Sequence, residues 1–432
     1  MKPTPSLPRH VFSAAAVLAP AALAADPATA AQQPETDADA PAPREAPLTT
    51  ASPEDVGLSG EVLARIGPAM QDFVDRGRTA GVVTLVSRRG EIAHWDARGW
   101  RVRGEDPLEP NDIFRLYSMT KPVTSVAAMM LVEDGLISLD DKVGDVIPSF
   151  SDVRVYQDMG SRRPHRPMRI RHLLMHTSGL SYGFGSSRVD SMYNAMFDKN
   201  SEDPEPDLRE WADSLASLPL VDDPGDRWNY SLSTDLLGHV IEVVSGRTLD
   251  GFFRERIFDP LGMHDTGFHV PAAKQDRFTA LYRPAGKDLK VDDSPTDGSY
   301  SRPPAWLSGG GGLVSTAGDY LRFCRMLLGG GELDGVRLLD PETVRLMTRN
   351  QLEEDLLPVL GIPGMGFGLG FAVPAGGEDE IYWGAGVANT YFWIDPAEEI
   401  IAFAWTQLQP FGAAPVDRLL RQIVYEAIAD EN

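Results

Sequence analysis

The chain carries the sequence Tyr-Ser-Met-Thr-Lys at residues 117–121, and a long apolar stretch follows it. Residues 123–133 have the Ala, Met, Val and Leu content of a buried helix, which Gly135 can end. Ser118 then lies near the start of this helix, and Lys121 lies on the same face. The pattern therefore places a serine hydroxyl and a lysine amine within reach of each other.

These two groups suit nucleophilic catalysis. A serine hydroxyl becomes a good nucleophile only when a neighbouring group takes its proton, and a lysine that has lost its own proton can do so. Backbone N–H groups at a helix start can also hold an oxyanion. Alone, however, Ser-x-x-Lys is explained more simply by an N-cap serine and an exposed lysine. The same holds for Tyr230, a candidate proton shuttle that could merely pack against the helix expected over 236–244.

Segments that favour strands lie at both ends of the chain, with helical segments between them. Ser59 can cap a helix that runs towards Gly77 and is kinked at Pro68. The strand-like runs are residues 81–86, 92–95, 366–373, 391–394 and 400–405, and an amphipathic helix covers 416–429. We therefore expect one α/β domain in two parts, 52–130 and 281–432, with a mostly helical subdomain inserted at 131–280.

The composition excludes some partners. The 432 residues include 63 Asp and Glu against 40 Lys and Arg, which gives a formal charge of −23. Such a surface repels phosphate backbones and anionic lipid, so we expect neither nucleic acid nor a membrane surface as partner. The single cysteine, Cys324, allows no internal disulfide, and its helical surroundings predict a buried structural thiol.

The first residues resemble a secretory signal peptide. Lys2, Arg9 and His10 precede a small-residue apolar run, and Ala-Leu-Ala at 22–24 offers a cleavage site. We therefore expect a signal peptide at 1–24, a disordered linker at 25–51, and a secreted or periplasmic product. No lipid-accepting cysteine follows, so no stable membrane anchor is expected. A disordered Ala/Pro tail without an export role is the alternative.

Five stretches together are specific. They are residues 117–121, Arg-His-Leu-Leu-Met-His-Thr-Ser-Gly-Leu at 171–180, 224–231, Ser-Gly-Gly-Gly-Gly-Leu-Val-Ser-Thr at 308–316, and 391–396. In order and spacing, over nearly all of the chain after Ser52, they resemble the class C branch of the serine β-lactamase and penicillin-binding-protein superfamily. Within that branch the chain is most similar to the family VIII carboxylesterases.

The resemblance carries expectations about fold and roles. It implies an antiparallel sheet flanked by N- and C-terminal helices, with an inserted, mostly helical subdomain. It also implies Ser118 as nucleophile, Lys121 as its base partner and Tyr230 as general base or acid. No metal or organic cofactor is expected.

Two motifs depart from the penicillin-recognising pattern. Leu232 stands where those enzymes usually carry Asn, and Tyr-Trp-Gly-Ala-Gly at 382–386 replaces Lys-Thr-Gly. The register of Trp383, Gly384, Ala385 and Gly386 is ambiguous; we prefer Gly386 as the final glycine, with the N–H just after it completing the oxyanion hole. No cationic side chain lies in the motif, which argues against β-lactam or D-Ala-D-Ala substrates.

Three further patterns suggest other chemistry, each with a simpler explanation. Gly-Leu-Ser-Tyr-Gly at 179–183 matches a nucleophile elbow around Ser181, but the segment before it is typical of a helix and its turn, and no histidine occurs after His269. His172 and His176 have helical metal-ligand spacing without a third ligand, so packing and capping are favoured. The glycines at 309–312 lack the Lys of a phosphate loop and favour close backbone packing.

The sequence thus predicts hydrolysis of small or short-chain carboxylic esters through an acyl-enzyme on Ser118. An acyltransferase, a D-aminopeptidase, a weak β-lactamase and a non-catalytic penicillin-binding-like sensor are the alternatives. Tyr117, Tyr182, Trp383 and Tyr391 are candidate substrate contacts, although core packing explains each of them equally well.

Overall fold

The computed structural model describes residues 47–158, 160–200, 206–376 and 381–428. The predicted signal peptide and most of the predicted linker lie outside these residues, so both stay predictions. Pairing begins slightly ahead of Ser52, because the Ile92 N–H donates to Thr49 O and the Ala51 N–H donates to Ile92 O.

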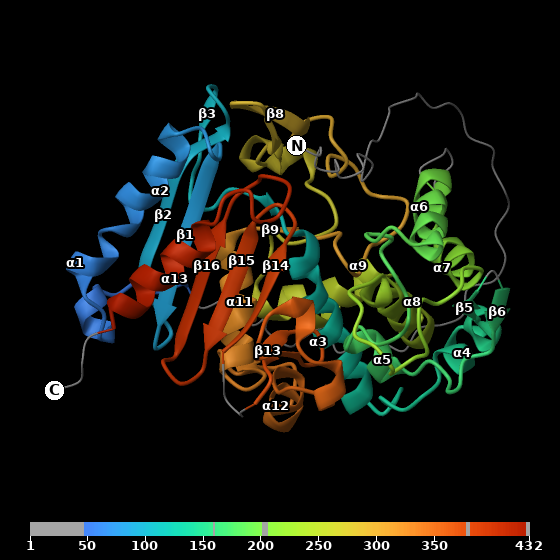
Figure 1. Ribbon diagram of the computed structural model, residues 1–432. Helices are drawn as coiled ribbons and strands as arrows, with labels where there is room; N and C mark the ends of the chain where they lie inside the picture. Colours follow the sequence, from blue (N-terminus) through green and yellow to red (C-terminus); the bar gives the residue numbers. More distant parts are fainter. Residues whose placement is uncertain (1–46, 159, 201–205, 377–380, 429–432) are drawn as a thin grey trace, which may run out of the picture. The chain divides into compact units, whose positions relative to one another are not determined.

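One antiparallel sheet of eight strands, drawn from both ends of the chain, organises the fold (Figure 1). Its order is β12-β13-β14-β15-β16-β1-β2-β3, and Val83 of β1 pairs with Trp405 of β16. The predicted antiparallel sheet is therefore confirmed. The strands are β1 (Gly81–Arg88), β2 (Glu91–Val102), β3 (Asp106–Pro107), β12 (Met365–Phe367), β13 (Ala372–Pro374), β14 (Tyr382–Gly386), β15 (Thr390–Asp395) and β16 (Ile400–Trp405).

Successive side chains along each strand point to opposite faces of the sheet, and both faces are apolar. Val82 and Ala402 lie on the face covered by α1 (Gly60–Leu63), α2 (Ile66–Asp75) and α13 (Val416–Glu426). Val83 and Phe403 lie on the opposite face, together with α3 (Thr120–Glu133) and α11 (Ala317–Leu328), where the buried Cys324 also lies. Figure 1 shows α2 and α13 crossing one side of the sheet.

Two predicted elements differ from the structure at backbone breaks. The helix capped by Ser59 stops at Leu63 and restarts at Ile66, because Pro68 has no N–H to donate to the Ala64 carbonyl. The predicted strand over 366–373 is wrong: it is the hairpin of β12 and β13, which reverses near Gly370 (φ +100°).

The middle of the chain is mostly helical. It contains α5 (Ile170–Leu174), α6 (Arg188–Asn200), α7 (Leu208–Ala216), α8 (Ser233–Ser245) and α9 (Leu249–Phe253), with short α4 (Val143–Val146) and α10 (Asp259–Leu261) and the small hairpin β5 (Val155–Gln157) and β6 (Gly160–Arg162). The remaining elements are β4 (Phe114–Arg115) paired with β9 (Val314–Ser315), the hairpins β7 (Leu281–Ala285)–β8 (Asp288–Asp293) and β10 (Glu332–Leu333)–β11 (Val336–Arg337), and α12 (Pro341–Thr348). Among the described residues, no helix is long and apolar enough to cross a membrane.

A buried arginine fixes the segment that leads to the nucleophile. Arg115 is fully buried, and its Nε donates to Asp293 Oδ2 at 2.8 Å while its Nη1 donates to Thr279 O at 2.5 Å. Its guanidinium also lies 4.1 Å from the Phe278 ring centroid. The strand before Ser118 is thereby tied to the β7–β8 hairpin.

We expect Arg115→Met to lower the free energy of unfolding by about 3 kcal/mol or more, because it leaves the Asp293 carboxylate without its buried partner. Arg103→Met is the matched control: Arg103 pairs with Asp288 on the same hairpin, but both side chains are exposed to solvent, so we expect a much smaller loss. Urea unfolding of the two variants measures the difference; equal losses would contradict it.

Candidate active site

Ser118 lies in a tight turn at the start of α3. The 3₁₀ turn η2 (Tyr117–Met119) runs directly into α3, and the Ser118 side chain is half-buried. Tyr117 adopts φ +48°, which is uncommon for a residue other than glycine. Leu116 holds this turn in place, since its N–H donates to Leu313 O at 2.9 Å and its carbonyl accepts from Thr390 Oγ1 at 3.2 Å. Backbone strain of this kind occurs at functional sites that the surrounding structure over-determines.

The Lys121 amine is buried beside Ser118. The residue is 3% exposed, and its Nζ contacts three oxygens: Ser118 Oγ at 3.2 Å, Tyr182 Oη at 3.1 Å and Gly310 O at 2.7 Å. Three acceptors match the three protons of an ammonium group. The prediction from the i, i+3 spacing is met in geometry, because Lys121 reaches the serine hydroxyl directly.

Asp235 supplies negative charge to this network. It is 1% exposed, and its Oδ1 accepts from the Gly310 N–H at 3.0 Å and from Ser308 Oγ, while its Oδ2 accepts from Tyr182 Oη at 3.3 Å. Burial raises the pKa of the Asp235 carboxyl, although Lys121 opposes this. Burial and the Asp235 charge together raise the pKa of the Tyr182 phenol well above its ordinary value, so Tyr182 keeps its proton and acts as a hydrogen-bond donor.

The Tyr230 ring packs over the same amine. Lys121 Nζ lies 4.7 Å from the ring centroid, which is within the range of a cation–π contact. Tyr182 and His176 also contact the Tyr230 ring, at centroid distances of 5.5 and 4.7 Å. Burial, and to a smaller degree Lys121, lowers the pKa of the His176 imidazole well below its ordinary value, so this ring is a neutral support for Tyr230.

The end of β14 lies against the nucleophile turn. A Cβ atom at Gly386 would lie 2.2 Å from the Leu116 carbonyl oxygen, whereas one at Gly384 would meet the Phe392 ring on the core face. Only a glycine therefore fits where the strand passes the turn that carries Ser118. This geometry favours Gly386 as the final glycine of the motif.

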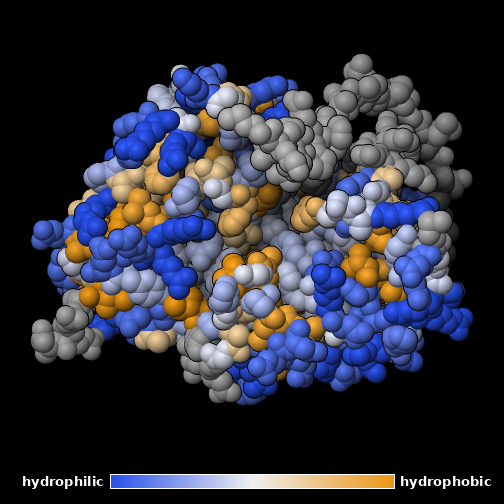
Figure 2. All heavy atoms as spheres, in the orientation of Figure 1, coloured by the Kyte–Doolittle hydropathy of each residue, from blue (hydrophilic) through white to orange (hydrophobic). Residues whose placement is uncertain are grey.

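The start of α3, where Ser118 lies, is next to a hollow on the surface. α3 begins between β14 on one side and α5 and α8 on the other (Figure 1), and Figure 2 shows the molecule hollowed in this region. Ser118, Tyr182 and Tyr230 are each half-buried, so they are partly accessible there.

The other predicted substrate contacts pack against neighbouring aromatic rings. Tyr391 is 7% exposed in the core beneath α13, and Ala385 packs towards the same side. Trp383 is half-buried with its ring 5.4 Å from that of Tyr391. Tyr117 packs edge-on against Tyr300. Burial favours core packing for Tyr391, whereas the half-buried Tyr117, directly before Ser118, and Trp383 stay candidate substrate contacts.

The alternative motifs have structural roles in this fold. Ser181 is buried and donates to the Asp190 carboxylate at 2.9 Å, whereas the lysine amine contacts Ser118. His172 Nδ1 accepts from the Arg169 N–H and so caps α5. No group of three or more His, Cys, Asp or Glu residues that could hold a metal occurs in the part of the chain that the structure describes.

Sequence reasoning missed the roles of Asp235 and Gly310. The glycine run at 309–312 predicts close packing, and a Cβ at Gly310 would indeed lie 2.3 Å from Asp235 Oδ2. Nothing in the sequence indicates that this contact also orients the lysine. The available signal was an aspartate five residues after Tyr230, facing a loop that lacks side chains.

Comparison with known proteins is consistent with this geometry. Residues 68–426 match the family described as Beta-lactamase, and the chain belongs to that family. Protein Rv1367c of Mycobacterium tuberculosis (strain ATCC 25618 / H37Rv) is 38% identical over 355 residues, which cover 77% of this chain and 87% of that protein.

Two further relatives have named activities. Esterase EstB of Burkholderia gladioli is 30% identical over 413 residues, covering 88% of this chain and all of that protein. The solved structure of EstCE1, described as a hydrolase with promiscuous acyltransferase activity, superposes with a TM-score of 0.75 at 27% identity, covering 84% of this chain and 98% of that one. Family and relatives together indicate a hydrolytic or acyl-transfer enzyme.

We expect a fluorophosphonate probe, which phosphonylates activated serines, to label Ser118, because its hydroxyl lies 3.2 Å from the buried Lys121 amine. Peptide mass spectrometry locates the adduct. Ser181→Ala, the matched control, should be labelled at the wild-type rate, and Lys121→Ala should be labelled at least about a hundredfold more slowly. An adduct on Ser181 would contradict the assignment of the nucleophile.

Proposed function

We propose that this protein is a carboxylesterase that hydrolyses small or short-chain neutral esters through an acyl-enzyme on Ser118. The observation that carries the proposal is the Lys121 amine, buried and 3.2 Å from Ser118 Oγ. The named activities of EstB and EstCE1 support the same reaction class.

Acylation would start from the deprotonated form of Lys121, whose neutral amine has one lone pair free to take the Ser118 proton. Ser118 Oγ attacks the ester carbonyl, and the oxyanion is held by the Ser118 N–H and the N–H that follows Gly386. The tetrahedral intermediate then collapses, the ester C–O bond breaks, and the alcohol oxygen takes the proton back by way of Lys121 and Tyr230. Water attacks the acyl-enzyme by the same route in reverse.

The sequence of β14 supports a substrate without a charged group next to the scissile bond. Its sequence, Tyr-Trp-Gly-Ala-Gly, has no Lys or Arg to pair with a carboxylate next to the scissile bond. A charged carboxylate bound there would lose its hydration without a partner. We therefore propose neutral esters in preference to β-lactams or D-Ala-D-Ala peptides.

Acyl transfer to an alcohol is the second candidate, and the likeness to EstCE1 favours it. It uses the same acyl-enzyme, which an alcohol instead of water then attacks. Measuring butyl butyrate against free butyrate, with p-nitrophenyl butyrate as donor and 1-butanol as acceptor, separates the two activities.

We expect p-nitrophenyl butyrate to be hydrolysed by the wild type and not by Ser118→Ala, whose loss in kcat should exceed about 10³-fold. A chromogenic cephalosporin should be cleaved poorly by both, because the strand offers no cation to its carboxylate. Ester turnover that survives in Ser118→Ala would overturn the proposal.

We expect Tyr230→Phe and Tyr182→Phe to differ. Tyr230→Phe removes a proton-transfer group and should lower kcat by about 10²-fold or more. Tyr182→Phe removes one hydrogen bond to Lys121, which keeps its contacts to Ser118 and Gly310, so kcat should fall by about tenfold. Steady-state kinetics at pH 8 compares the two; a larger loss for Tyr182→Phe would give that residue the proton-transfer role.

A further inference from the structure

A row of aromatic rings runs from the catalytic lysine to the surface. The centroid of Trp228 lies 6.1 Å from that of Tyr230, Tyr230 lies 5.5 Å from Tyr182, and Tyr182 lies 5.0 Å from Phe184. The last pair is stacked at 15°. The inner part of the row touches Lys121, whose Nζ lies 4.7 and 5.3 Å from the Tyr230 and Tyr182 rings.

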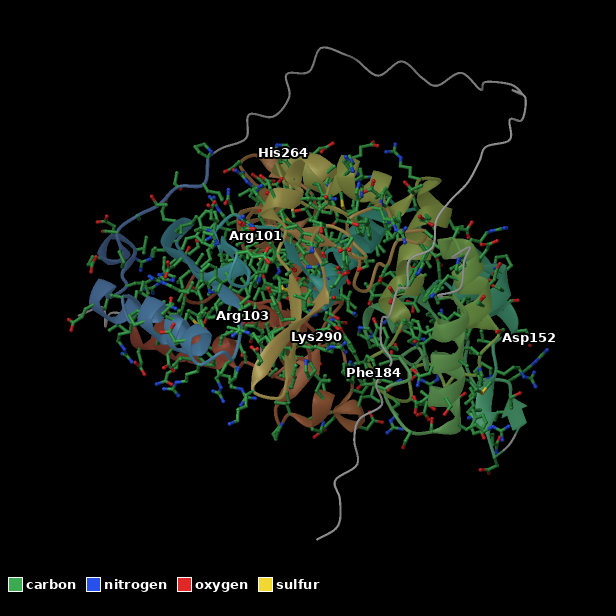
Figure 3. All side chains as sticks on the ribbon, turned by 90° about the horizontal axis from the view of Figure 1, so that it is seen from above. Arg101, Arg103, Asp152, Phe184, His264 and Lys290 are labelled. Atoms are coloured by element: carbon green, nitrogen blue, oxygen red, sulfur yellow. The ribbon has the colours of Figure 1, made fainter. Side chains whose placement is uncertain are left out.

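The outer end of the row is open. Phe184 is 69% exposed, the largest fraction among the exposed large hydrophobic residues of the described chain. Figure 3 shows it at the edge of the mostly helical part that faces the β7–β8 hairpin, on which Lys290 is labelled. An exposed aromatic ring continuous with a reactive centre indicates a ligand contact more than chance exposure does.

The loop that presents Phe184 is held in place by hydrogen bonds. The Gly183 N–H donates to Ser181 Oγ at 2.9 Å, and Asn194 Nδ2 donates to the Gly183 carbonyl at 3.0 Å. Asp190 Oδ1 in turn accepts from Ser181 Oγ. The buried Ser181 hydroxyl therefore has a structural role: it holds Gly183, the residue directly before Phe184.

The position of the row indicates which part of an ester substrate contacts it. The end of β14 at Gly386 lies against the turn that carries Ser118, and Lys121 links Ser118 Oγ to Tyr182 and to the Tyr230 ring. The leaving alcohol oxygen must lie next to the group that returns its proton, so the alcohol extends along the row. The acyl part then has to occupy the remaining space.

We propose that the row of Phe184, Tyr182, Tyr230 and Trp228 binds the alcohol part of the ester and selects large apolar alcohols, cyclic or aromatic ones in particular. This rests on the proposed esterase function. The step itself is unchanged: the bond between acyl carbon and alcohol oxygen breaks, the bond to Ser118 Oγ forms, and the serine proton leaves on the alcohol.

The reverse of this step is acyl transfer to an alcohol, and the row would bind that alcohol as well. An alcohol that attacks the acyl-enzyme passes through the transition state by which it would leave, so it occupies the same contacts. Large apolar alcohols are therefore both preferred leaving groups and preferred acyl acceptors at this site.

The test compares ethyl butyrate with 2-cyclohexylethyl butyrate. Both are esters of primary alcohols and give the same butyryl-enzyme, so the ratio of their kcat/KM values reports contacts to the alcohol alone. In the wild type we expect the cyclohexyl ester to be favoured at least tenfold, consistent with the burial of one apolar ring face. Phe184→Ser should lower that ratio about tenfold, and Phe184→Leu should restore part of it.

Leu136→Ser is the control. Leu136 is also exposed, at 57%, but it follows α3, whose 14 residues span about 21 Å away from Ser118. Its kcat/KM ratio should equal that of the wild type. With 2-cyclohexylethanol as acceptor, transfer from p-nitrophenyl butyrate should fall in Phe184→Ser in the same proportion as the ratio.

Several outcomes would overturn the inference. An equal fall of both kcat/KM values in Phe184→Ser would mean that the ring only positions Tyr182. A selective loss on ethyl octanoate would place the acyl chain on the row, and a preference seen only above the solubility limit of the ester would indicate a lipid-surface contact. No alcohol preference in a wild type that still needs Ser118 would refute the inference and leave the esterase function intact.

Discussion

The burial of one amine is the constraint on which the site depends. A lysine that is 3% exposed loses its hydration, so each of its protons needs an acceptor and its charge needs a counter-charge. Ser118, Tyr182 and Gly310 supply the acceptors, and Asp235 supplies the charge through the last two. Four segments far apart in the sequence must therefore converge within a few ångströms, which explains the glycines at 309 and 310, where a Cβ would lie 2.7 Å from Thr234 O and 2.3 Å from Asp235 Oδ2.

The same burial leaves few groups free to move a proton. Tyr182 keeps its proton because burial and Asp235 raise its pKa, and His176 stays neutral because burial lowers its pKa. In the proposed mechanism, proton transfer is therefore assigned to Ser118, Lys121 and Tyr230 and not to Tyr182 or His176.

Local spacing explains which features can be predicted from sequence. Ser118 and Lys121 lie three residues apart in a helix start, so their contact follows from helical geometry alone. The alternating strands β15 and β16 are equally local. The Lys121–Tyr182 bond joins residues 61 apart and depends on how α5 and α8 pack, and no local pattern encodes it. The break before Ile66 and the reversal near Gly370 show the converse, since single residues there override the pattern of their neighbours.

The two sides of the serine differ in how firmly they are built. On the oxyanion side, Gly386 belongs to an antiparallel ladder in the main sheet, and even one added methyl group would strike the Leu116 carbonyl. On the leaving-group side, Phe184 projects from a loop that a few side-chain hydrogen bonds hold. If the two proposals hold, chemistry that all esters share depends on the rigid sheet, whereas contacts that distinguish one alcohol from another lie on a loop. A loop tolerates substitution better than a central strand, so alcohol selectivity can change without disturbing the acyl-enzyme chemistry.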